Sequence, residues 1–158
     1  MNLHHYSNAL EDAGRNSTYR IRLTAVTEVW DTVPMPEKTR YGFTAEAWSA
    51  GKREARDFLI SRARERGTTT YSELCSVVTS VQLRPYSFGM MAFLNEVCAE
   101  EDAANGIMLA SLVTRRDTGL PGNGYFKFAA GLGRDTFDRE AFWRSEIERI
   151  YAAFPPKE

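Results

Sequence analysis

The chain has 158 residues, of which 43% are hydrophobic, and this is enough for one folded domain with a genuine core. Its 20 basic and 21 acidic residues nearly balance, which argues against a general nucleic-acid coat but is compatible with a local basic face. Two cysteines without a CxxC spacing, no secretion signal and no long apolar run predict a cytoplasmic protein without a disulfide framework or a membrane span.

Residues 1–40 are predicted to form an N-terminal arm. Most of this segment is polar and weakly patterned, but residues 19–23 alternate apolar side chains with arginines, as a short strand does. A short helical segment is the alternative just after them. Pro34 and Pro36 then interrupt regular structure. We therefore expect the main domain to cover residues 41–158.

Capping residues and apolar spacing predict three helices in the first half of this domain. Thr44 is a suitable N-cap for an amphipathic helix that ends near Gly67. After three threonines that favour a short extended segment, Thr70 and Glu73 form a capping box that opens a second helix. A third helix begins after Ser87, with Phe88, Met91, Leu94 and Cys98 spaced for a buried face.

The segment 107–128 is predicted to form a long hairpin. "IMLASLVTR" is nearly continuous in apolar character, as expected of a covered strand, and "YFKF" is typical of a second strand. The glycines of the intervening loop permit the backbone angles that a long reversal needs. A last helix covers residues 138–154.

This order predicts an α+β fold of the winged-helix type. It has helices, a small antiparallel sheet and a long hairpin that would project as the wing, preceded by the N-terminal extension. A generic α+β domain in which the hairpin packs differently is the alternative.

The stretch "RGTTTYSELC" follows the first long helix, and its "TYSEL" run links a short strand to a helix. This segment resembles the opening of the DNA-binding domain in the alkylguanine alkyltransferase and alkyltransferase-like family, over residues 48–74. The resemblance implies a DNA-binding winged-helix unit. The family's acceptor segment, Pro-Cys-His-Arg or Pro-Trp-His-Arg, has no counterpart here, so the resemblance does not extend to alkyl transfer.

No complete catalytic or metal-binding motif accompanies this fold. The loop glycines lead into a strand pattern without a following GK[ST], so a nucleotide-phosphate cradle is not expected. His4 and His5 are adjacent instead of four residues apart, and Cys75 has the helical spacing of a core residue. We therefore predict no catalytic residue, no metal site and no cofactor.

Basic and polar side chains at the start of the third helix and on the wing define a candidate nucleic-acid interface. Arginine and lysine contacts to phosphates supply most non-specific affinity. The end of the third helix carries four carboxylates, which must face away from any bound DNA. A solvated hairpin whose charges protect its edge is the alternative interpretation. The predicted interface residues are Arg84, Tyr86, Ser87, Asn95, Arg115, Arg116, Asn123 and Lys127.

These features favour a small accessory or regulatory protein that binds nucleic acid, with double-stranded DNA as the expected partner. One alternative is a protein–protein adaptor on the same fold, and another is a metal-dependent enzyme that processes nucleic acid through carboxylates. The sequence does not fix the oligomeric state. The adaptor hypothesis predicts an exposed contact surface formed by Met90, Phe93, Leu120 and Pro121.

Overall fold

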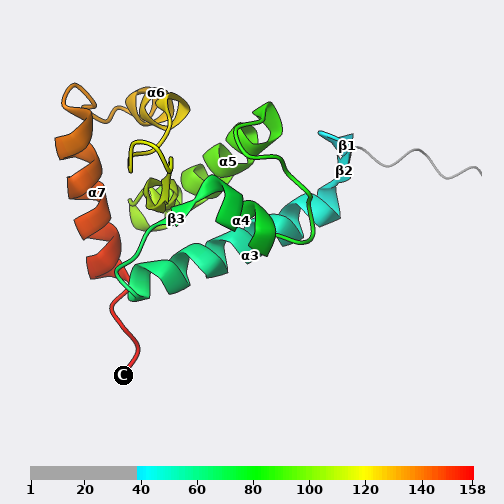
Figure 1. Cartoon of the computed structure of the whole chain (residues 1–158), viewed down its shortest axis with the longest axis horizontal. Coiled ribbons are helices and arrows are strands. Elements are labelled where there is room, and N and C mark those ends of the chain that lie inside the picture. The colour runs from blue at the N-terminus through cyan, green and yellow to red at the C-terminus, as the bar shows by residue number, and fades with distance from the viewer. Residues whose placement is uncertain (1–38) are drawn as a thin grey trace, which may run out of the picture. The chain divides into compact units, whose positions relative to one another are not determined.

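A computed structural model describes residues 39–158, and Lys38–Glu158 form one compact unit (Figure 1). Residues 1–38 of the predicted arm, including the strand predicted at residues 19–23, lie outside the described residues. The elements are β1 (Thr39–Arg40), β2 (Phe43–Thr44), α3 (Ala45–Arg64), β3 (Thr69–Thr70), α4 (Tyr71–Val77), α5 (Phe88–Asn105), the 3₁₀ helix η1 (Leu109–Leu112), β4 (Val113–Thr114), α6 (Asn123–Gly131) and α7 (Arg139–Ala153). The α+β class is confirmed.

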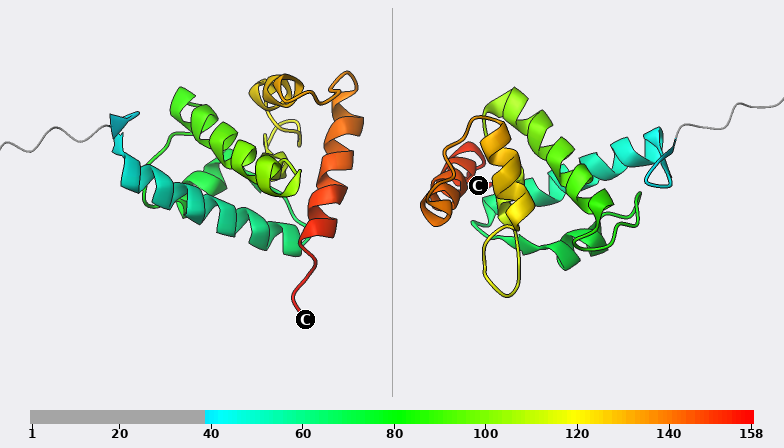
Figure 2. Two further views of the ribbon diagram at one scale, coloured as in Figure 1. Left: turned by 180° about the vertical axis from the view of Figure 1, so that it is seen from behind. Right: turned by 90° about the horizontal axis from the view of Figure 1, so that it is seen from above.

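Helix α3 runs along one side of the domain. Helix α7 lies across the C-terminal end of α3 (Figures 1 and 2). The side chain of Thr44 accepts a hydrogen bond from the amide of Ala47 at 3.0 Å, as an N-cap does. The predicted amphipathic face is confirmed, since Trp48, Leu59 and Ala63 are buried.

The capping box that opens α4 is confirmed. The Thr70 hydroxyl accepts from the Glu73 amide at 3.2 Å, and the Glu73 carboxylate accepts from the Thr70 amide at 3.0 Å. Strand β3, which ends at Thr70, pairs with β4 in parallel. The predicted antiparallel sheet is therefore wrong at this position. Helices α4 and α5 together form a crossover, and a crossover returns the chain in its original direction.

The apolar run 107–113 is almost completely buried, as predicted, but only its end is a strand. Residues Leu109–Leu112 form η1, and β4 contributes two residues to the sheet. A short apolar run does not distinguish a buried strand from a buried helical turn, which explains the difference.

The second strand of the predicted wing is wrong. Residues 125–128 belong to α6, and the described part of the chain has no β-hairpin after β4. Tyr125, Phe126 and Ala129 are all buried. Two adjacent buried side chains with a third one turn later form a helical face, whereas a half-buried strand alternates.

The predicted face of α5 is rotated from the true one. Phe88 is 83% exposed and Met91 is 42% exposed, although Leu94 and Cys98 are buried as expected. Phe93 is instead fully buried, with its ring in edge-to-face contact with Trp48.

The predicted adaptor surface is therefore wrong. Met90 and Phe93 face the core, Pro121 is buried and Leu120 is half-buried. The predicted helix start is confirmed, since the Ser87 hydroxyl accepts from the Met90 amide at 3.1 Å.

Candidate functional site

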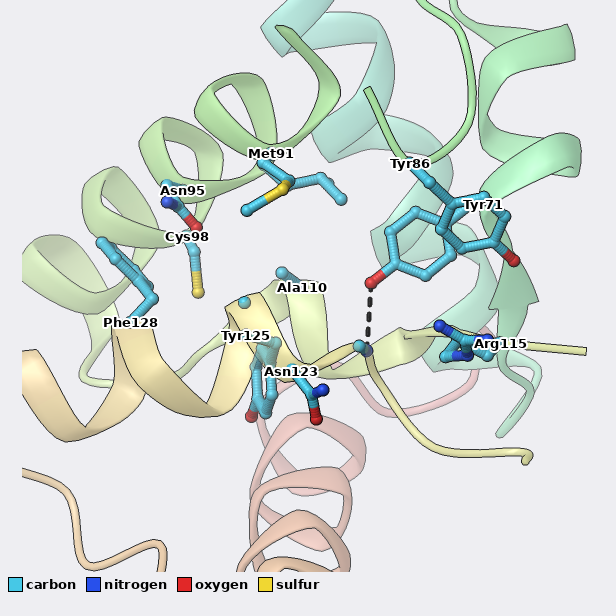
Figure 3. Close-up of a pocket in the computed structure, with 13 residues that line it drawn as sticks. Tyr71, Tyr86, Met91, Asn95, Cys98, Ala110, Arg115, Asn123, Tyr125 and Phe128 are labelled. Atoms are coloured by element: carbon cyan, nitrogen blue, oxygen red, sulfur yellow. Dashed lines mark hydrogen bonds between the residues drawn. The ribbon is translucent and has the colours of Figure 1, made fainter. Parts of the chain in front are cut away.

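A cavity of about 200 Å³ lies between α5, α6 and the start of α4 (Figure 3). From α5, the side chains of Met91, Asn95 and Cys98 line it, and Phe128 closes one end from α6. The opposite end is formed by aromatic and cationic side chains. These are Tyr71, Tyr86 and Arg115.

The loop at residues 115–122 leads from β4 to α6, and in the view from above it extends away from the helices (Figure 2). Its end is tied to α4, because the amide of Gly122 donates to the hydroxyl of Tyr71 at 3.2 Å. Burial raises the pKa of Tyr71, so its hydroxyl stays neutral near pH 7. The same hydrogen bond therefore places the first turn of α6 at the cavity wall.

Tyr86 stands at the mouth of the cavity in an unusual conformation. Its backbone φ is +60°, a left-handed value that is costly for a bulky residue, and 55% of its surface is exposed. Its ring lies 4.8 Å from that of Tyr71. The guanidinium of Arg115 lies 5.6 Å from the Tyr86 ring centroid, within the range of a cation–π contact.

Arg115 is also held by its own loop. Its Nε and Nη2 atoms donate to the two oxygens of Asp117 at 3.0 and 2.9 Å. This hydrogen-bonded guanidinium holds the pKa of the Asp117 carboxyl below its usual range. The pair fixes where the guanidinium points and leaves part of it exposed beside Tyr86.

The structure brings together half of the predicted interface residues and leaves the others outside the cavity. Tyr86, Asn95, Arg115 and Asn123 all line it, although they come from the loop before α5, from α5, from the loop at residues 115–122 and from α6. Ser87 caps α5, so its hydroxyl is occupied. The remaining predicted side chains are exposed but do not line the cavity. These are Arg84, Arg116 and Lys127.

Several lining residues were not predicted from the sequence. Tyr71 and Phe128 were assigned to the core and to a strand, and nothing in their local pattern distinguishes a cavity wall from a core position. Arg139 was also missed. Its Nη1 donates to Asn123 Oδ1 at 2.7 Å, and its guanidinium lies 5.1 Å from the Phe126 ring centroid. In the sequence, Arg139 only follows Asp138, the N-cap of α7, and nothing in that local pattern predicts its contact with Asn123.

The carboxylates at the end of α5 are paired with basic side chains. Glu101 is buried and accepts from Arg56 Nε at 2.6 Å, while Glu100 pairs with Lys52. Asp102 pairs with Arg134. Glu96 accepts from Trp48 Nε1 at 3.0 Å and pairs with Arg40 at 2.6 Å. None of these four carboxylates lines the cavity. Nucleic-acid binding by this helix requires that its carboxylates do not face the bound phosphates.

The thiol of Cys98, which lines the cavity, is not activated. Burial raises the pKa of the Cys98 thiol to about 12, which keeps it protonated and weakly nucleophilic. Across residues 39–158, no three histidine, cysteine, aspartate or glutamate side chains come together as a metal site would require.

Comparisons of this chain with protein families, curated proteins and solved structures found no match. Within the described residues, no helix is both long and apolar enough to cross a bilayer.

Proposed function

We propose that this protein binds nucleic acid, with DNA as the expected partner, through a surface that we name the cationic face. The face surrounds the mouth of the cavity and the loop that leads into α6. It consists of Arg84, Tyr86, Arg115, Arg116, Asn123 and Lys127.

One observation supports this proposal above the others. Side chains chosen for their chemistry converge around one cavity, while the carboxylates of α5 are ion-paired and none of them lines that cavity. Lys127 follows Asn123 by one helical turn on the same face of α6, which extends the cationic face along the helix. Asp117 is the acidic residue within this loop, and Arg115 neutralises it.

The proposal includes a distant relation to winged-helix proteins. The order α3, β3, α4, α5, β4 is that of a winged helix up to the wing, and the loop with α6 takes the place of the hairpin. It also includes the predicted cytoplasmic location, because Cys75 and Cys98 are both free thiols.

Salt-dependent binding tests the proposal. We expect labelled DNA oligonucleotides, single- and double-stranded, to bind with an affinity that falls steeply as salt rises, because bound phosphates release counterions. An Arg115→Ala, Arg116→Ala variant should weaken binding and reduce the slope of log affinity against log salt by about two, roughly one for each lost phosphate contact. Fluorescence anisotropy across a salt series measures both quantities.

Arg53→Ala, Arg64→Ala is the matched control. Both arginines lie on α3 and line hollows that share no residue with the cavity, so the same charge is removed elsewhere. The proposal fails if neither form of DNA binds, or if the control pair weakens binding as much as the Arg115, Arg116 pair does.

A protein partner remains the second candidate, now through different side chains. Phe88 and Met91 are exposed on the first turn of α5, next to Tyr86. A co-purifying partner that is lost on Phe88→Asp, together with an absence of salt-sensitive DNA binding, would favour this candidate.

A further inference from the structure

We infer that the cavity accepts an unpaired nucleobase, so that the preferred ligand is single-stranded nucleic acid and not an intact duplex. This inference rests on the proposed function and deepens it, because it names which form of nucleic acid the cationic face recognises.

The size and walls of the cavity suit one planar ring system. Its volume is about 200 Å³, whereas an apolar cavity of about 150 Å³ already admits benzene. Met91 and Phe128 supply apolar walls, and Asn95 brings a side-chain amide to the same space, while the amide oxygen of Asn123 accepts from Arg139. An aromatic ligand with a polar edge matches this lining.

The mouth of the cavity presents an aromatic ring for stacking. Tyr86 is more than half exposed while its backbone stays in a strained left-handed conformation, and Tyr71 and Arg115 hold its ring from neighbouring segments. Exposed aromatic rings beside arginine are the platform on which single-stranded nucleic acids stack their bases. Since every base has a π-face, this platform requires an accessible base and no particular sequence.

A place for phosphate lies directly beside the cavity. A second hollow is lined by Arg115, Asn123 and Arg139, so two guanidinium groups flank it. Arg115 and Asn123 line both spaces. A base in the cavity would therefore have cationic groups next to its own backbone, which is the complementarity that a nucleotide needs.

A duplex does not offer this combination. Its bases are paired and stacked, so only their edges are accessible in the grooves. The described chain has no hairpin wing to follow a groove, since the loop leads instead into α6. The cavity can be filled only by a base that has left the stack or was never in it.

The test compares four ligands of one sequence, each about 12 nucleotides long. They are single-stranded DNA, single-stranded RNA, the DNA annealed to its complement, and the single DNA strand with its central bases removed. We expect one or both intact single strands to bind the full chain about tenfold or more tighter than the duplex and the abasic strand. The DNA and RNA arms show which sugar is preferred.

Tyr86 variants give the second readout. Tyr86→Ala should weaken binding of the single strand by about tenfold, whereas Tyr86→Phe should keep it, because stacking needs the ring and not the hydroxyl. A fluorescent purine analogue placed within the strand should be quenched on binding to the wild type and to Tyr86→Phe, but not to Tyr86→Ala. Thermal unfolding checks that each variant is folded, which the exposure of Tyr86 favours.

The outcomes separate the two proposals. Equal or tighter binding of the duplex, equal binding of the abasic strand, or an unchanged affinity in Tyr86→Ala would overturn this inference. If the duplex alone binds and depends on Arg115 and Arg116, the proposed function stands and the inference is wrong. If no ligand binds, both fail.

Discussion

The hydroxyl of Tyr71 connects two parts of the chain that lie 51 residues apart, since it accepts the Gly122 amide at the entry to α6. Tyr71→Phe removes this acceptor and keeps the ring that packs against Tyr86. We expect the free energy of unfolding to fall by about 1 kcal/mol, the usual net value of one hydrogen bond. Hydrogen exchange at the Gly122 amide should accelerate because its partner is lost, and mass spectrometry or NMR would measure it.

Tyr151→Phe is the control for this change. Tyr151 is a half-buried tyrosine on α7 whose ring contacts Arg66, and it lies outside the cavity. Its substitution should leave exchange in the loop at residues 115–122 unchanged. Wild-type exchange at Gly122 in Tyr71→Phe would show that the hydrogen bond does not hold the loop.

Gly51 and Gly131 lie in helices but have different surroundings, so we expect substitution by alanine to change the stability in opposite directions. A Cβ added at Gly51 in α3 would lie 2.7 Å from Cγ2 of the buried Val81, whereas nothing lies within 4 Å of a Cβ at Gly131 in α6. Overpacking costs about 1–3 kcal/mol, which exceeds the gain in helix propensity of about 1 kcal/mol. Gly51→Ala should therefore lower the stability by about 1 kcal/mol, and Gly131→Ala should raise it by about 0.5 kcal/mol. Urea denaturation of both variants measures these changes, and a shift in the same direction would contradict the packing argument.

The helices that begin with a capping side chain could be predicted from the sequence, whereas α6, which has no capping side chain, could not. Thr44, Thr70 and Ser87 accept amide hydrogen bonds at the starts of α3, α4 and α5, as their side chains favour. The N-cap position of α6 is Gly122, which has no side chain to accept an amide hydrogen bond. Its aromatic residues suit a strand equally well, so local preference favoured the wrong structure.

The site is less predictable than the helices because it is assembled from distant segments. The polar side chains of Tyr86, Asn95, Arg115 and Asn123 made them candidates. Their convergence depends on the rotation of α5 and on the formation of α6, and local sequence patterns predict neither. The rotation follows from packing, since Phe93 reaches Trp48 only when Phe88 faces the solvent. Burial of that kind is a property of the assembled domain.

Charge is divided unevenly over the described domain, although the whole chain carries a formal net charge of −1. The carboxylates at the end of α5 are paired with α3 and with Arg134, and those ion pairs join elements of the core. Arg84, Arg116 and Lys127 are exposed. Each ion pair uses one basic and one acidic side chain, so the pairing leaves the overall balance unchanged, and the proposed cationic face depends on where the other basic side chains lie.

Acid should destabilise the domain through two carboxylates that hold the ends of α4. Glu73 accepts the Thr70 amide and the Thr69 hydroxyl before the helix, and Glu54 accepts the hydroxyl and amide of Ser80 beyond it. These hydrogen bonds hold the pKa of both carboxyls below the ordinary glutamate value of about 4.3. The unfolded chain therefore takes up protons first as the pH falls. The stabilisation is complete above about pH 5 and is lost as the pH decreases through the lower, folded-state values.

Glu54→Gln and Glu73→Gln isolate this contribution. At pH 7 each variant should be less stable than the wild type by roughly 0.5–1 kcal/mol, a modest value because both carboxylates are largely solvated. As the pH falls through the lowered pKa values of the folded state, the wild-type carboxyls become protonated too, so the difference should shrink towards zero. Melting temperatures between pH 3 and pH 7 measure the convergence. Curves for wild type and variants that do not converge before acid unfolds the wild type would show that the lowered pKa values do not support α4, and the acid sensitivity of the fold would then have to arise from the ion pairs of α5.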